Sequence, residues 1–156
     1  MATNVHELSH MPGKTLIFLA DDNPGDVTLL RIALSDNGVD CDLAVFSDGA
    51  NALAEIVRAE STVEGQPELF VLDLNLPKVD GITLLKRLRS SDVFHHTPVI
   101  IWTSSDSPSD QLKSHESGAD RHVCKPAKLA AFLGLGGLIK GMLEEATRVR
   151  LGAAGI

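Results

Sequence analysis

The stretch LFVLDLNLPKVDGITLLKRL, residues 69–88, decides the fold of this chain. It begins with an almost continuous apolar run at residues 69–72, which is typical of a parallel strand covered by helices on both faces. Asp73 follows this run directly, and leucines then recur at helical spacing over residues 82–90. A strand, a loop with an acidic residue and a helix in succession predict one unit of a parallel α/β sheet.

The same alternation of strands and helices extends along the chain on both sides of this stretch. Apolar runs predict further strands at residues 15–20, 42–46, 98–102 and 121–124. Helical periodicity predicts further helices at residues 24–37, 48–59, 109–116 and 128–147. Because crossovers are right-handed and connections short, this (βα)5 pattern predicts a doubly wound, flavodoxin-like α/β fold with a five-stranded parallel sheet of order 2-1-3-4-5.

The length and composition fit one compact domain, with 156 residues of which 44% are hydrophobic and 22% charged. We expect a flexible N-terminal tail at residues 1–13, the folded domain at residues 14–147 and a C-terminal tail at residues 148–156. The N-terminal tail contains HELSH, residues 6–10, which matches the zinc-peptidase pattern HExxH. It lacks a helical context and a third ligand, so we interpret the match as chance or as a tag-like metal affinity, and not as a catalytic site.

Net charge, hydropathy and cysteine content argue against several classes of protein. A formal net charge of −7 argues against a surface that binds nucleic acid directly. No segment approaches the roughly 18 consecutive apolar residues of a membrane span, and residues 1–14 lack the apolar centre expected of a secretory signal. Cys41 and Cys124 are too few for a disulfide-stapled scaffold, and we expect both to be reduced core thiols. These features predict a soluble cytoplasmic protein with no membrane contact.

Polar residues follow four of the predicted strands at their carboxyl ends, where ligands bind in sheets of this kind. They are Asp21 and Asp22 after the first strand, Asp73 with Asn75 after the third, Thr103 with Ser104 after the fourth, and Lys125 with Pro126 after the fifth. Each feature alone is ambiguous, since an acidic pair after a strand is most often a solvated turn or a helix cap. Their joint occurrence at one edge of one sheet predicts a shared acidic cleft.

Carboxylates brought together repel one another unless a cation shares their site. Mg²⁺ prefers a few carboxylate oxygens with carbonyls and waters, which suits Asp21, Asp22, Asp73 and the backbone carbonyl of Asn75. The formal charges then balance, because three carboxylates, one divalent metal and the Lys125 ammonium sum to zero. The sequence therefore predicts a magnesium site.

A carboxylate in this position can act as a nucleophile toward phosphorus, and Asp73 is the candidate. The three phosphoryl oxygens would be met by the metal, by the Lys125 ammonium, and by the Thr103 hydroxyl with the Ser104 backbone N–H. Pro126 directly after the lysine suits a tight turn and is a candidate for a cis peptide bond.

Four segments of the chain resemble the signature segments of response regulator receiver domains: LIFLADDNPGD at 16–26, VLDLNLPKVDGITLLKRLR at 71–89, PVIIWTSS at 98–105 and CKPAKL at 124–129. The resemblance spans residues 14–143. It implies that Asp21 and Asp22 hold Mg²⁺ and that a sensor histidine kinase phosphorylates Asp73. It also implies that Thr103 and Lys125 sense the phosphoryl group.

Three further segments resemble the stand-alone receivers associated with bacterial phytochromes: DDNPGD at 21–26, STVEGQPE at 61–68 and SDVFHHTPVIIWTSS at 91–105. This resemblance implies a phytochrome-type kinase as donor and a homodimer formed through strands 4 and 5 and the last helix. One position departs from the family, because His122 stands where a switching tyrosine or phenylalanine is common. His122 is either a switch residue or a cover for the strand edge.

We therefore expect a single-domain phosphoacceptor signalling protein, not an enzyme, that acts by a surface change or by dimerisation. An aspartyl-nucleophile phosphatase is an alternative, but Asn75 stands where such enzymes carry a second acid. An FMN-binding flavodoxin would require a phosphate loop where Asp21 and Asp22 stand. An unphosphorylated receiver-like scaffold is the third alternative, although such proteins usually lack one of the site residues.

Overall fold

The structure is a computed structural model, and it describes residues 14–153. The strands are β1 (Thr15–Ala20), β2 (Cys41–Phe46), β3 (Leu69–Leu72), β4 (Val99–Thr103) and β5 (Arg121–Cys124). The helices are α1 (Pro24–Asp36), α2 (Gly49–Ala59), α3 (Gly81–Arg89), α4 (Pro108–Glu116) and α5 (Leu129–Ala153). The predicted tail at residues 1–13 and its HExxH match lie outside the described residues.

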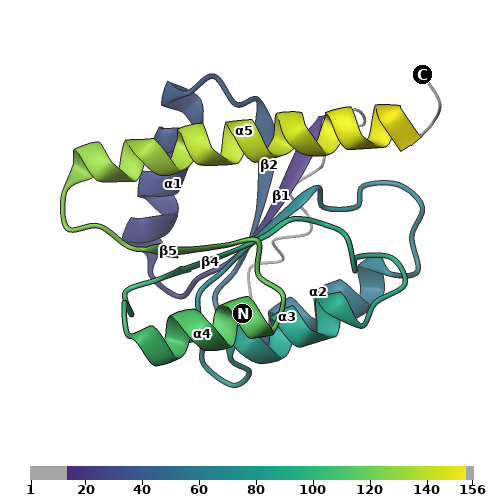
Figure 1. The fold of residues 1–156 in the computed structure, drawn as a ribbon, viewed down its shortest axis with the longest axis horizontal. Helices are drawn as coiled ribbons and strands as arrows, with labels where there is room; N and C mark the ends of the chain where they lie inside the picture. The colour runs from purple at the N-terminus through teal and green to yellow at the C-terminus, as the bar shows by residue number, and fades with distance from the viewer. Residues whose placement is uncertain (1–13, 154–156) are drawn as a thin grey trace.

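The five strands form one parallel sheet in the order β2-β1-β3-β4-β5, which confirms the predicted fold. Helices α1 and α5 cover one face of this sheet, and α2, α3 and α4 lie on the other (Figure 1). Ala20 pairs with Phe46 on one side and with Leu72 on the other. This register brings the carboxyl ends of β1 and β3 level with each other.

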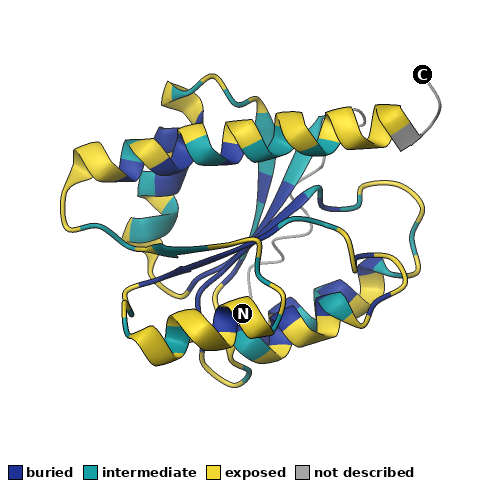
Figure 2. Cartoon of the chain, viewed as in Figure 1, coloured by how far each residue is buried: buried dark blue, intermediate teal, exposed yellow. Residues whose placement is uncertain are grey.

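Each face of the sheet has its own apolar core, because successive side chains of a strand point to opposite faces. In β1, Phe18 joins the core beneath α2 and α3, whereas Leu19 joins the core beneath α1 and α5. The central strands are buried along their length (Figure 2). Burial of each large apolar side chain contributes about 1.5–3 kcal/mol, so these two cores fix the strand ends that carry the polar residues.

A glycine lets α5 pack closely on α1. A Cβ atom at Gly136 would lie 2.2 Å from the Ala33 carbonyl oxygen, well inside van der Waals contact. Asn37 Nδ2 joins the two helices by donating to Ala33 O at 2.8 Å and to Leu133 O at 3.0 Å. The close packing of α5 on α1 thus depends on the absence of a side chain at Gly136.

Helix α5 extends beyond the predicted domain boundary. It continues to Ala153, so the interpretation of residues 148–153 as a tail is wrong. Arg150 Nη2 lies 2.9 Å from Glu68 Oε1 and attaches the extended helix to the start of β3. The interpretation of Cys124 as a core thiol is also wrong, because this residue is exposed on the edge strand β5, while Cys41 is half-buried. Within residues 14–153 no helix is long and apolar enough to cross a membrane.

Candidate functional site

The turn after β1 holds the Asp21 side chain in a buried position at the carboxyl ends of the strands. Its N–H donates to Phe46 O at 3.0 Å, and its side chain is fully buried. Asp21 Oδ1 accepts the Asn23 N–H at 2.9 Å, and Asn23 in turn caps α1 by accepting from Gly25 N–H and Asp26 N–H. The carboxylate of Asp21 is therefore held rigidly at the start of α1.

Asp73 is held in the same way at the end of β3. Its N–H donates to Ala20 O at 2.9 Å, and its Oδ1 accepts the Asn75 N–H at 3.1 Å. The side chain of Asn75 is exposed. Gly81 allows α3 to begin directly against this strand end, since a Cβ atom there would lie 2.2 Å from Asp73 O. A larger residue at this position would displace the loop that positions the carboxylate.

Three carboxylates gather at this edge. One oxygen each of Asp21, Asp22 and Asp73 lies within 4.8 Å of the other two, and Asp22 is the exposed member. Burial raises the pKa of Asp21, and the contact with Lys125 opposes this effect without cancelling it. Asp21 Oδ2 is buried without a hydrogen-bond donor in the described part of the chain. The clustered carboxylate oxygens are ligands that suit a hard divalent cation that keeps several waters, such as Mg²⁺.

Lys125 lies across the cluster with its side chain only 7% exposed. Its Nζ lies 2.8 Å from Asp21 Oδ2, an ion pair without hydrogen-bond geometry, and donates to Asp73 Oδ2 at 2.9 Å. Burial alone would lower the pKa of Lys125, but its contacts with the carboxylates outweigh burial and raise it. The lysine is therefore a buried ammonium at neutral pH.

The predicted cis bond at Pro126 is wrong, because the described residues contain no cis peptide bond. The trans form of an X–Pro bond is the more stable by about 0.5–1 kcal/mol. The lysine is directed inward by strand pairing instead, since its backbone N–H donates to Thr103 O at 2.7 Å. The side chain of Thr103 is fully buried, and Ser104 is exposed in the loop after β4.

His122 contacts the loop after β4 and the helix that follows it. Its Nε2 lies 3.2 Å from Ser105 O, and its Nδ1 lies 3.0 Å from Ser114 Oγ on α4. Ser105 N–H lies 3.4 Å from Thr103 Oγ1, and the Ser105 hydroxyl donates to Asp110. A chain of contacts thus leads from the buried threonine to α4.

Sequence reasoning missed two residues of this site. Asp26 Oδ2 lies 2.9 Å from Lys125 Nζ, and the ring centroid of Trp102 lies 5.1 Å from the same nitrogen. Asp26 could have been found from its place three residues after the cap residue Asn23, on the first turn of a helix that begins at the cleft. Trp102 gave no signal beyond that of a buried strand residue.

Comparisons with known proteins support this geometry. The sequence profile of the response regulator receiver domain matches residues 17–134. Response regulator Rcp1 of Synechocystis is 30% identical over 115 residues, which cover 73% of this chain and 78% of Rcp1. Transcriptional regulatory protein TrcR of Mycobacterium tuberculosis is 35% identical over 145 residues, 93% of this chain and 51% of TrcR. The chain thus spans about half the length of TrcR.

Solved structures agree with the sequence relatives. The phosphorylated cyanobacterial phytochrome response regulator RcpA superposes with a TM-score of 0.73 and 28% identity, over 82% of this chain and 92% of that one. The Mn²⁺-bound form of Rcp1 gives a TM-score of 0.72 and 28% identity, over 81% and 91% of the two chains. The resemblance to phytochrome-associated regulators is confirmed. The chain belongs to the response regulator receiver domain family.

Proposed function

We propose that this protein accepts a phosphoryl group on Asp73 from a sensor histidine kinase, in a reaction that requires Mg²⁺. The observation that carries the proposal is the buried Lys125 ammonium 2.9 Å from Asp73 Oδ2, beside the other two carboxylates of the cluster. The Asp73 carboxylate would thereby lie between two positive charges, the ammonium and the cation that the cluster would hold. This is the charge arrangement that phosphoryl transfer requires.

In the proposed step, a carboxylate oxygen of Asp73 forms a bond with phosphorus while the bond from phosphorus to the kinase histidine breaks. The electron pair of the broken bond stays with the histidine ring, and an acyl phosphate remains on Asp73. The Lys125 ammonium neutralises one phosphoryl oxygen. The predicted metal ligands are Asp21, Asp22, Asp73 and the Asn75 carbonyl, and the cation they would hold supplies further neutralisation.

The third phosphoryl oxygen has candidate partners in the Thr103 hydroxyl and the Ser104 backbone N–H. The Thr103 side chain is fully buried beside the Lys125 backbone. If the hydroxyl turns to the phosphoryl group, it leaves its contact with the Ser105 N–H. Ser105 O in turn contacts His122, which links this loop to α4. We propose His122 as the switch residue that passes the change from the loop to the helix.

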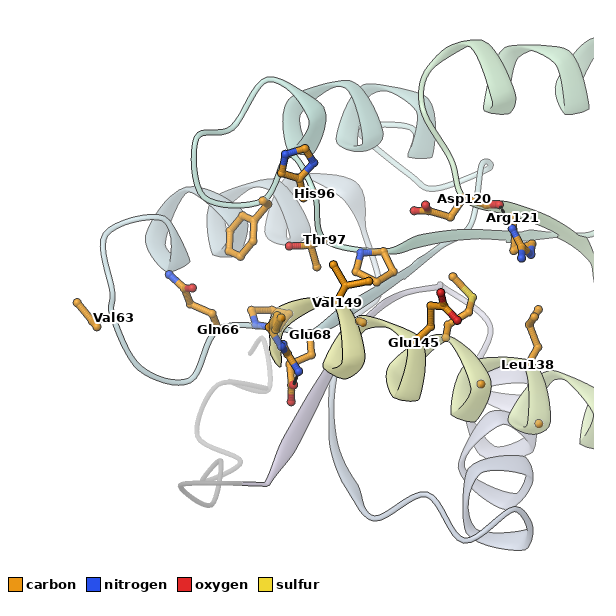
Figure 3. Close-up of a pocket in the computed structure, with 18 residues that line it drawn as sticks. Val63, Gln66, Glu68, His96, Thr97, Asp120, Arg121, Leu138, Glu145 and Val149 are labelled. Carbon is orange, nitrogen blue, oxygen red and sulfur yellow. Dashed lines mark hydrogen bonds and ion pairs between the residues drawn. The ribbon is translucent and has the colours of Figure 1, made fainter. Parts of the chain in front are cut away.

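The proposed output is a change of surface or a homodimer through β4, β5 and α5. A groove of about 1120 Å³ lies between α5 and the amino ends of these strands (Figure 3). The acidic cluster lies at the carboxyl ends of the strands. It carries Arg121 from β5 and Glu145 from α5, next to the apolar side chains of Leu138 and Val149. Opposite charges within one patch suit self-association about a two-fold axis.

The kinase we propose is of the phytochrome type. This proposal is supported by the similarity to Rcp1 and RcpA, the latter of which is described as a phytochrome response regulator. A receiver of this kind would act as a phosphoacceptor in signalling, not as an enzyme on free substrates.

Intact mass of the full chain after incubation with phosphoramidate tests the phosphoacceptor role. We expect a single phosphoryl adduct that requires Mg²⁺ and is absent from Asp73→Asn. Asp92→Asn is the matched control, because Asp92 is an exposed carboxylate outside the cluster. An adduct that persists in Asp73→Asn, or none in the wild-type chain with Mg²⁺, contradicts the proposal.

A further inference from the structure

A fourth carboxylate, that of Asp26, contacts the buried ammonium. Asp26 Oδ2 lies 2.9 Å from Lys125 Nζ, the same distance as Asp73 Oδ2. The Asp26 side chain is only 17% exposed, so the pair is largely shielded from solvent. Asp26 is not among the carboxylates whose oxygens gather within 4.8 Å of one another. It therefore contacts the lysine without sharing the cation site.

The start of α1 explains why Asp26 reaches the lysine. An acidic side chain three residues after the cap residue can fold back to the N–H of that residue. Here the Asn23 N–H already donates to Asp21 Oδ1 at 2.9 Å. The Asp26 carboxylate is therefore available to the ammonium, while its negative charge still faces the positive end of the helix dipole.

Trp102 also lies close to the ammonium. The centroid of its ring lies 5.1 Å from Lys125 Nζ. An indole offers the ammonium a polarisable face but no hydrogen-bond acceptor, because its ring nitrogen only donates. The carboxylates are thus the strong partners of this ammonium among the described residues.

We propose that Asp26 is a positioning residue that holds the Lys125 ammonium and thereby releases the clustered carboxylates to a divalent cation. This inference rests on the proposed function. An ammonium has three N–H donors, and three carboxylates surround this one. A cation bound to the cluster would compete with the ammonium for the oxygens of Asp21 and Asp73. Asp26 then keeps the buried charge paired, whereas an unpaired buried ammonium is costly.

Mn²⁺ binding to the full chain, measured by loss of the free-ion EPR signal, tests the role of Asp26. The four proteins are the wild type, Asp26→Asn, Lys125→Met and the double variant. Asparagine retains the size of the side chain without its charge, and methionine retains an apolar stem without the ammonium. We expect Asp26→Asn to weaken Mn²⁺ binding about tenfold while the lysine is present, as for loss of a contact between charged groups. In the Lys125→Met background we expect Asp26→Asn to weaken Mn²⁺ binding about twofold or less.

The inference is overturned if Asp26→Asn weakens Mn²⁺ binding by the same factor in the wild type and in Lys125→Met. Asp26 would then act on the cation only through its own charge. Asp26→Ala lacks any side-chain oxygen and must weaken binding at least as much as Asp26→Asn, so a smaller effect also overturns it. Asp36→Asn, at the exposed far end of the same helix, is the control for charge and leaves Mn²⁺ affinity unchanged.

The experiment separates this inference from the proposed function. If the wild-type chain binds Mn²⁺ and shows the unequal factors but takes no phosphoryl group, the proposed function fails and the positioning role stands. If it takes the phosphoryl group and the factors are equal, the role of Asp26 alone fails. A wild-type chain that binds no Mn²⁺ overturns both.

Discussion

The Lys125 ammonium lies 5.1 Å from the centre of the Trp102 indole. The two residues come from neighbouring strand ends, and the indole is fully buried. The chain contains a single tryptophan, so its fluorescence reports on this one position. The ring therefore lies where it can sense any movement of the ammonium that faces the carboxylates.

We expect Mg²⁺ to change the Trp102 emission of the wild-type protein and to leave that of Lys125→Met nearly unchanged. The reason is that a cation competes with the ammonium for the carboxylates, and the indole senses the ammonium through its ring face. Fluorescence titration of both proteins with Mg²⁺ measures the effect. An equal change in Lys125→Met would mean that the indole senses the cation itself.

Asp21→Asn should stabilise the metal-free protein at neutral pH. Burial raises the pKa of Asp21, so the folded state binds a proton more tightly than the unfolded state, where the pKa is about 3.9. Above the pKa that Asp21 has in the folded state, the ionised side chain therefore destabilises the folded protein to the full extent. The advantage of the variant should shrink as the pH falls through that pKa toward about 3.9. Urea unfolding in EDTA from neutral to acid pH measures this, and an advantage that grows on acidification would contradict it.

Gly136→Ala should lower the free energy of unfolding by about 1–3 kcal/mol, because the added methyl group would overlap the Ala33 carbonyl of α1. Gly134→Ala is the matched control in the same helix. Apart from the local helix backbone, no atom of the described residues lies within 4 Å of a Cβ there, so this variant should stabilise α5 by about 0.5–1 kcal/mol. Denaturant midpoints of the two variants are compared. Equal shifts would mean that α5 does not pack against α1 as described.

His122→Ala should loosen α4. Ser114 is the only buried residue of this helix, and His122 lies 3.0 Å from its hydroxyl. Loss of a hydrogen bond worth about 1 kcal/mol should speed amide exchange in α4 about fivefold. Hydrogen exchange followed by mass spectrometry measures this, with α2 as the internal reference. Unchanged exchange in α4 would rule out the proposed coupling through His122.

Gly141→Arg should weaken the proposed homodimer about tenfold, because it places a bulky charge in the groove between α5 and β5. Beyond the backbone of its own helix and its two chain neighbours, no atom of residues 14–153 lies within 4 Å of a Cβ at this position, so the monomer should fold normally. Gly134→Arg, on the same helix but outside the groove, is the control. Sedimentation of the phosphorylated proteins measures association, and equal dimer constants would exclude this groove from the interface.

Much of the fold could be predicted because its signals are local. The apolar run at 69–72 and the leucines of α3 each belong to one element, and the predicted strand and helix limits agree with the structure within two residues, apart from the end of α5. That helix continues to Ala153, and its Arg150 pairs with Glu68, a residue distant in the sequence. No periodicity within the helix could indicate this contact.

By itself the sequence determined the (βα)5 architecture and the gathering of Asp21, Asp73 and Lys125 at one edge. The physical reason is that parallel strands end at the same edge of a sheet, so strand ends read from hydrophobic patterns place their polar residues together. Only the tertiary structure decided that Asp26 contacts the Lys125 ammonium together with Asp21 and Asp73. It also decided that His122 joins the loop after β4 to α4. These contacts depend on side-chain distances between separate elements, which packing sets and local patterns do not encode.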